Sequence, residues 1–180
     1  TMTISPTGME IGNCSLLDDA SAAAEAMLMM FALRSRDQIK NGCNQLFVDD
    51  DIFPQMFDVL VTRSEPFGIE IIRDNYDTYK FTGKEFGAIV QYPSASGRIR
   101  DYAAFAAAAH EAGAKVTAVC DLMSLVLLAS PGQWGADIAV GKCISSLEAM
   151  EDPQVVANNY VFDWTVSSGP WEGKKMKMAA

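Results

Sequence analysis

Two charged residues stand beside apolar segments that are expected to be strands, and together they suggest amine and carboxylate chemistry. Asp121 closes the segment 114–121, and Lys142 directly follows the segment 135–141. In a parallel sheet, ligands bind beyond the carboxyl ends of the strands, where these residues and the turn 92–94 are expected. A lysine can form a Schiff base when a desolvated site lowers its pKa. This edge of the predicted sheet is therefore the first place to look for a site.

Other catalytic groups are scarce. His110 is the single histidine, so no Ser-His-Asp arrangement can be traced, and its position late in an expected helix favours a surface or helix-end role. No phosphate loop of the G-x-x-x-x-G-K type occurs. The cysteines form no C-x-x-C pair and no zinc spacing, so we expect reduced core thiols and no metal site. They are Cys14, Cys43, Cys120 and Cys143.

A second possible site lies at residues 13–15, at the start of an expected helix, where a phosphate could bind free backbone N–H groups. Ser15 is also a good N-cap, with Asp18 three residues later as in a capping box, and we favour this simpler interpretation. The alanine-rich helix is expected to span 15–36. Residues at helical spacing should face the core, and they are Leu16, Ala20, Ala23, Met27, Met30 and Phe31.

Short apolar strands alternate with helices along the rest of the chain. A helix is expected at 53–68, with Pro54 at its start and Gly68 as its stop, and another at 100–113. Segment 79–85 suggests a turn or a short hairpin. Strands are expected at 45–49, 69–73, 86–93, 114–121 and 135–141. This alternation predicts an α/β domain with a largely parallel sheet and helices on both faces.

Composition limits the class of protein. The chain has 180 residues, 49% of them hydrophobic, which is enough for one domain with a real core. A net charge of −9 argues against nucleic acid, because phosphate binding needs clustered Lys and Arg. The longest apolar run is interrupted by Asp121, so no membrane span is expected. The segment 1–13 lacks the basic start and apolar core of a signal peptide.

Three long segments carry a resemblance to a known family. They read "TGMEIGNCSLLDDASAAAEAM" (7–27), "FVDDDIFPQMFDVLVTRSEPFGIEI" (47–71), and a third from "GAIVQYPSASGRIRDY" through "WGADIAVG" (87–141). They resemble the first of the two homologous halves of the glycine decarboxylase P-protein, the pyridoxal-phosphate subunit of the glycine cleavage system. The resemblance covers about Thr1 to Gly141. It implies a truncated fold-type-I large domain of the pyridoxal-phosphate transferases, with three layers.

The resemblance also implies that this chain has no catalytic residue. In the family, the second half carries the Schiff-base lysine and the first half is its degenerate partner. The equivalent position of the first half falls on Ser145, three residues after Lys142, so we do not expect Lys142 to act as the nucleophile. The glycine-rich family segment after Gly141 is not restored, and Phe53 stands where the family usually has histidine.

Asp121 is the one residue that the resemblance suggests for cofactor binding. Active fold-type-I enzymes place an aspartate here to pair with the pyridine nitrogen of the cofactor. We favour a simpler interpretation, an inherited carboxylate that caps the following helix. No cofactor is expected for the chain alone, and pyridoxal phosphate is expected only if a partner chain supplies the lysine.

The sequence after Gly141 has no counterpart in the family, so we expect a P-protein-like domain at 1–141 and a divergent extension at 142–180. Aromatic residues of this extension should either cover the sheet or anchor a partner, since Trp and Tyr are typical interface residues. They are Tyr160, Phe162, Trp164 and Trp171.

Two functions are compatible with these features. The chain could be a non-catalytic structural or accessory subunit of a larger protein assembly, a pseudoenzyme derived from the P-protein. Alternatively, it could be a split half of glycine decarboxylase that assists decarboxylation with a lysine-bearing partner chain. Both require protein partners, and the family resemblance alone suggests a mitochondrial location.

Overall fold

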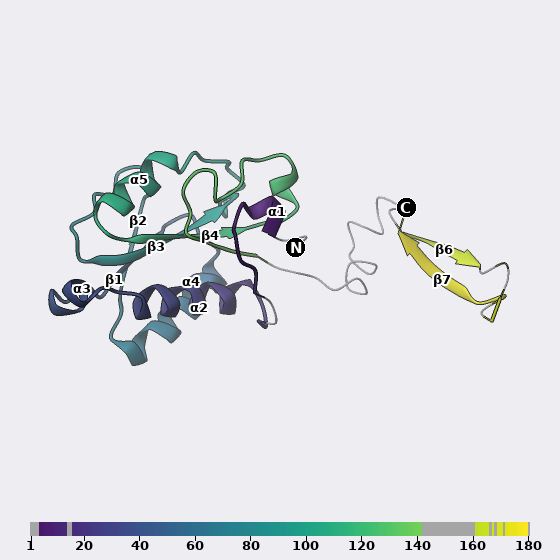
Figure 1. Ribbon diagram of the computed structural model, residues 1–180, viewed down its shortest axis with the longest axis horizontal. Helices are drawn as coiled ribbons and strands as arrows, with labels where there is room; N and C mark the ends of the chain where they lie inside the picture. The colour runs from purple at the N-terminus through teal and green to yellow at the C-terminus, as the bar shows by residue number, and fades with distance from the viewer. Residues whose placement is uncertain are drawn as a thin grey trace. The chain divides into compact units, whose positions relative to one another are not determined.

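The computed structural model of the chain describes residues 4–13, 16–141, 161–165, 167, 169–170 and 172–179 (Figure 1). The chain divides into two compact units, Thr1–Lys142 and Cys143–Ala180. None of the helices among the described residues is long and apolar enough to cross a membrane.

The first unit is built on a five-stranded sheet in which every neighbouring pair is parallel, in the order β2-β1-β3-β4-β5. The predicted parallel sheet is therefore confirmed. The possible hairpin at 79–85 is wrong, because residues 75–84 form turns and irregular chain that lead across β1 into β3. The strands are β1 (Gln45–Asp49), β2 (Glu70–Asp74), β3 (Glu85–Tyr92), β4 (Lys115–Cys120) and β5 (Ile138–Val140).

Strand β2 lies on one side of the central pair β1 and β3, and strands β4 and β5 lie on the other side. From β1 the chain passes through α4 (Pro54–Ser64) to β2 on one side, while from β3 it passes through α5 (Ala103–Glu111) to β4 on the other. Right-handed crossovers in opposite directions place their helices on opposite faces of the sheet, as Figure 1 shows. Such a reversal opens a crevice at the carboxyl ends of the strands.

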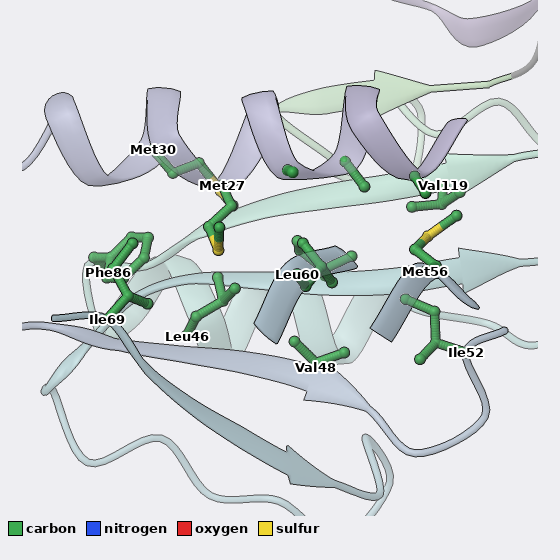
Figure 2. Packing of buried hydrophobic residues seen from close by; sticks show 14 residues of the cluster. Met27, Met30, Leu46, Val48, Ile52, Met56, Leu60, Ile69, Phe86 and Val119 are labelled. Carbon is green, nitrogen blue, oxygen red and sulfur yellow. The ribbon is translucent and has the colours of Figure 1, made fainter. Parts of the chain in front are cut away.

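One face of the sheet is covered by α2 (Asp19–Ala32) and α4. Met27 and Met30 of α2 pack toward Leu46 and Val48 of β1, with Leu60 of α4 between the layers (Figure 2). These side chains are 0–1% exposed, so they form a dry core that holds both helices on the sheet.

The long helix expected at 15–36 is wrong at both ends. The structure begins α2 at Asp19 with Asp18 as N-cap, and Ser35 caps the separate helix α3 (Arg36–Lys40). Leu16 therefore precedes the helix and is 49% exposed rather than buried. The other five residues expected in the core are buried or packed against it.

The opposite face carries α5 and an aromatic cluster. Phe47 of β1 contacts the rings of Tyr79, Phe81 and Phe105, with ring centroids 4.5–6.3 Å apart. Tyr79 and Phe81 belong to the 75–84 segment, so the cluster fastens that segment over β1. With α2 and α4 on the other side, the unit has three layers, as predicted.

The buried carboxylate of Glu85, at the amino end of β3, also holds the 75–84 segment in place through hydrogen bonds. Glu85 is 0% exposed and accepts hydrogen bonds from Tyr79 Oη (2.6 Å), Thr82 N and Oγ1 (both 3.0 Å), and Gly83 N (3.0 Å). Burial alone would raise the pKa of Glu85, but these hydrogen bonds outweigh it and hold the pKa below its ordinary value.

Short elements complete the first unit, and the described strands of the second unit pair with each other. Gly68 ends the α4 region with φ of 64°, in the left-handed region where glycine is favoured, and confirms the predicted stop. The short helices are α1 (Ile4–Thr7), η1 (Glu65–Phe67) and η2 (Ser124–Val126). In the second unit, β6 (Val161–Thr165) pairs antiparallel with β7 (Lys175–Ala179).

Candidate functional site

A cavity of about 350 Å³ lies at the carboxyl ends of β3 and β4. The first residue of α2, the loop before α4 and the turn after β4 supply the rest of its walls. A site was expected at this end of the sheet, and two of the three expected strand ends, at 92–94 and 120–121, line the cavity. At the third, Gly141 is not a lining residue, and residues 142–143 lie outside the described residues. The lining residues are Asp19, Phe53, Gln91, Pro93, Ser94, Val119, Cys120, Asp121 and Leu122.

Asp121 lies where β4 gives way to the turn that leads into η2. Its Oδ1 accepts a hydrogen bond from Met123 N at 3.0 Å, and its backbone carbonyl accepts one from Ser124 Oγ at 2.7 Å. The side chain is exposed and also lines the cavity. The carboxylate thus stabilises the turn and still faces a space where it could meet a ligand. Its role in cofactor binding stays a prediction.

Phe53 and Gln91 form the wall between β1 and β3. The backbone N–H of Phe53 donates to Oε1 of Gln91 at 2.8 Å, which ties the loop before α4 to the end of β3. Gln91 is 4% exposed, whereas Phe53 is 38% exposed. The apolar ring of Phe53 therefore lines the cavity at the position where the family usually has histidine.

Cys120 is a poor nucleophile although it lines the cavity. It is 5% exposed, and burial, followed by the nearby charge of Asp121, raises the pKa of its thiol to about 12. The thiol therefore stays protonated at neutral pH. Cys43 is likewise buried and free, as predicted. Cys14 and Cys143 lie outside the described residues.

The amino end of α2 is already occupied by its own carboxylates. Asp18 accepts from Ser21 N at 2.7 Å, and Asp19 Oδ1 accepts from Ala20 N at 3.1 Å. The hydrogen bond from Ser21 lowers the pKa of Asp18 below its ordinary value. The N–H groups of Ala20 and Ser21 at this helix start are therefore already bonded within the chain. The phosphate site considered at residues 13–15 stays untested, because Cys14 and Ser15 lie outside the described residues.

His110 lies near the amino ends of β4 and β5, at the end of the sheet opposite the cavity. Its Nε2 is 2.9 Å from Oδ2 of Asp137, and Lys115 Nζ donates to Oδ1 of Asp137 at 3.2 Å. Asp137 precedes β5 and Lys115 begins β4, so the cluster joins the amino ends of these strands. His110 is far along α5 and not part of the cavity wall, in agreement with the predicted helix-end role.

Sequence reasoning missed a second polar group, centred on Asp49 at the carboxyl end of β1. Asp49 is 0% exposed, and Tyr102 Oη donates to its Oδ2 at 3.2 Å, but Oδ1 has no partner among the described residues. Burial raises the pKa of Asp49, although the charge of Arg100 opposes this shift. Arg100 itself pairs with Asp51 at 2.6 Å. The signal was present in the run Asp49–Asp51, which begins at the last residue of a buried strand.

The described residues do not fit an anionic phosphate cofactor. Asp121 could pair with a pyridine nitrogen, but such a cofactor also needs donors or cations for its phosphate. Among the described residues, the cavity lining instead holds a second carboxylate, Asp19, and no Lys, Arg or His. We therefore derive no step through pyridoxal phosphate on this chain.

Several predicted residues fall where side chains are not described. Lys142, Ser145, Tyr160 and Trp171 lie outside the described residues. Phe162 and Trp164 lie on β6, where their backbones pair with Met178 and Met176. Their part in binding a partner stays a prediction.

Comparison with known proteins gives a consistent result. The family model described as "Glycine cleavage system P-protein" matches residues 1–145. Glycine dehydrogenase (decarboxylating) of Bacteroides thetaiotaomicron is 52% identical over 135 residues, 75% of this chain and 14% of the relative, and that of Flavobacterium johnsoniae is 50% identical over 141 residues, 78% and 15%. The chain thus spans about one seventh of the length of these curated relatives.

A solved structure is similar as well. The crystal structure of glycine decarboxylase (P-protein) of the glycine cleavage system, in inhibitor-bound form, aligns with a TM-score of 0.70 and 26% identity, over 99% of this chain and 43% of that chain. This likeness, together with the parallel three-layer sheet, identifies the fold as that of the fold-type-I transferases.

Proposed function

The chain belongs to the glycine cleavage system P-protein family, and from that premise we propose that it is a non-catalytic subunit of a larger protein assembly. In this role the domain provides a folded surface for a partner chain and contributes no nucleophile or proton-transferring group. A mitochondrial location is part of the same proposal, resting on the family resemblance alone.

The observation that carries this proposal is the chemistry of the cavity. Its lining contains no lysine or histidine, its one thiol has a pKa raised to about 12, and an apolar ring stands at Phe53. A Schiff-base enzyme needs a desolvated amine, and general acid–base catalysis most often uses a histidine. Among the described residues the cavity lining offers neither an amine nor an imidazole.

The second candidate is a split half of glycine decarboxylase that frames the site of a lysine-bearing partner. The identity of about 50% to glycine dehydrogenase (decarboxylating) favours it, because this identity extends over three quarters of the chain. So does the exposed carboxylate of Asp121 at the cavity. Under this alternative, pyridoxal phosphate and the reaction would belong to the partner chain's lysine.

Reconstitution separates the two candidates. The purified chain is mixed with a lysine-bearing P-protein half, and glycine-dependent exchange of CO2 and absorbance near the Schiff-base band are recorded, with each protein alone as control. The non-catalytic proposal expects the exchange rate of the mixture to equal that of the half alone, with no added absorbance near the Schiff-base band, whether or not the two chains bind each other. An exchange rate that rises only in the mixture would overturn it and establish the split enzyme.

A further inference from the structure

The turn that joins α3 to β1 contains Asn41, the one asparagine in the sequence that a glycine follows. Asparagine is a thermolabile residue, because the backbone nitrogen of the next residue can attack its side-chain amide. Glycine has no Cβ to hinder this attack. Asn41 and Gly42 are both exposed, and a Cβ built at Gly42 would meet no atom within 4 Å. The sequence and the open space around the turn therefore both favour the attack.

In the folded chain, a hydrogen bond holds the attacking nitrogen. Gly42 N donates to the carbonyl oxygen of Ile39 at 3.1 Å, and Asn41 N donates to that of Asp37 at 2.9 Å. The N–H of Gly42 must leave this acceptor before its nitrogen can attack a neighbouring carbon, and breaking the hydrogen bond costs free energy. The reaction therefore requires the end of α3 to open.

The helix that precedes this turn is held mainly by polar contacts. α3 has five residues, and none of them is buried. Ser35 Oγ accepts from Gln38 N at 3.2 Å, Gln38 Oε1 accepts from Ser35 N at 2.9 Å, and Gln38 Nε2 donates to the carbonyl oxygen of Gly113 at 2.9 Å. Segments with few buried apolar contacts open locally at a low cost in free energy while the rest of the domain stays folded. Such an opening would release Gly42 N without global unfolding.

We propose that Asn41 is a site of spontaneous deamidation in the folded protein, and that the opening of α3 sets the rate of this reaction. Gly42 N bonds to Cγ of Asn41, and the side-chain nitrogen leaves as ammonia with the proton of the Gly42 amide, which gives a cyclic imide. Water then opens the ring at either carbonyl and produces aspartate or isoaspartate. The reaction consumes one water, releases one ammonia and needs no oxidant, cofactor or partner, so it is independent of the proposed function.

The isoaspartate product would loosen the start of β1. It inserts an extra carbon into the main chain directly before Gly42, so the hydrogen bond from Cys43 N to the carbonyl oxygen of Gln38, 2.9 Å long, loses its register. The thiol of Cys43 is 4% exposed and donates to the carbonyl oxygen of Gly83 at 3.2 Å. We expect this thiol to react faster with a thiol reagent in the isoaspartate form than in the parent.

Ageing of the purified full chain tests the site. Samples kept in mildly alkaline buffer are quenched with acid at intervals and cleaved after glutamate, and tandem mass spectrometry follows the peptide 26–70. Asn44 is a matched control within this peptide, because glutamine follows it. We expect Asn41 to gain the mass of deamidation severalfold faster than Asn44.

Variants of the α3 cap test what sets the rate. Gln38→Ala removes the side-chain bonds to Ser35 N and to the Gly113 carbonyl, and should accelerate conversion of Asn41 severalfold in the folded chain. In urea, where α3 is already open, the variant and the parent should convert at the same rate. Gln55→Ala, at an exposed position of α4, is the control and should change neither rate.

Ser35→Ala removes the N-cap of α3 and should have the same effect as Gln38→Ala, so it keeps the test decisive if one variant does not fold. Circular dichroism establishes that each variant is folded. Conversion of Asn41 no faster than that of Asn44 would refute the site. An unchanged rate in every folded cap variant would refute control by α3. Neither measurement uses a lysine-bearing half, so the reconstitution experiment can succeed or fail without affecting them.

Discussion

Glu85 and Asp49 are both fully buried carboxylates of one sheet, but they lie at opposite ends of it and have opposite surroundings. Glu85, at the amino end of β3, accepts hydrogen bonds from three residues on both of its oxygens. Among the described residues, Oδ2 of Asp49, at the carboxyl end of β1, accepts a hydrogen bond from Tyr102 at 3.2 Å, and Oδ1 has no partner. The pKa of Glu85 is accordingly held below its ordinary value, while that of Asp49 is raised.

The two ends of the sheet thus differ in how completely their buried polar groups are hydrogen-bonded. At the amino end, charged groups are satisfied by local turns and by ion pairs such as Lys115 with Asp137. At the carboxyl end, the Oδ1 atom of Asp49 has no partner among the described residues, and a cavity opens. Natural proteins tolerate such incomplete satisfaction mainly where binding takes place.

The largest effect should come from removing the satisfied carboxylate. Glu85→Ala leaves the hydroxyl of Tyr79 and the N–H groups of Thr82 and Gly83 without their acceptor, and should reduce the free energy of unfolding by about 3 kcal/mol. Urea unfolding measures this. Glu111→Ala, at an exposed position at the end of α5, is the control and should stay within about 0.5 kcal/mol of the parent. Equal losses in the two variants would refute the contrast.

A smaller loss is expected from Tyr102→Phe. The hydroxyl of Tyr102 is buried and lies 3.2 Å from Asp49 Oδ2 and 3.1 Å from the carbonyl oxygen of Gln91. Its removal leaves both acceptors without this donor and should cost about 1–2 kcal/mol in thermal or urea unfolding. A loss as large as that of Glu85→Ala would show that the carboxyl end is as well satisfied as the amino end.

Replacing Asp49, the incompletely bonded carboxylate, should stabilise the folded state, whereas the two preceding substitutions should destabilise it. Asp49→Asn keeps the shape, removes a buried charge, and should raise the free energy of unfolding at pH 7 by about 1 kcal/mol. Glu85→Gln is the matched control, and it should destabilise because its amide nitrogen cannot accept hydrogen bonds. Destabilisation by Asp49→Asn would show that the charge at this position is favourable in the folded state.

The pH dependence of stability sharpens the comparison further. Because the folded-state pKa of Glu85 is lowered, its contribution is present above its unfolded pKa of about 4.3 and is lost as pH falls below that value. Because the folded-state pKa of Asp49 is raised, the folded state binds more protons, and its contribution falls as pH rises from about 3.9 to the raised value. Urea midpoints measured from pH 3 to 8 should show the loss of stability attributed to Asp49 in the parent protein and not in Asp49→Asn. A slope that survives in Asp49→Asn would assign it to another group.

Local patterns were enough to predict most of the fold. Proline and glycine bracket the α4 region at Pro54 and Gly68, and short apolar runs between helices predict parallel strands, so the element order could be read directly. The start of α2 could not, because Ser15 and Asp18 are both good N-caps. The choice between them depends on which side chain meets a backbone N–H group in three dimensions, and Asp18 meets that of Ser21.

The location of the candidate site could be predicted from the sequence, but the chemical properties of its residues could not. The carboxyl-end rule located the turn at Pro93 and Asp121, because it depends only on strand direction. The contribution of Asp19, the loss of reactivity of Cys120 and the incomplete bonding of Asp49 depend on contacts between segments distant in sequence. Burial and partner geometry decide these properties, and sequence spacing does not encode either.

The central claim is that the chain contributes no Schiff-base lysine to its assembly. The complex is isolated from its native source under mild conditions and reduced with borohydride, which fixes any pyridoxal phosphate on the lysine that holds it. Mass spectrometry of the separated chains then maps the label. The account predicts that every lysine of this chain, Lys142 included, is unlabelled, whatever the partner carries. A phosphopyridoxyl group on any lysine of this chain would contradict it.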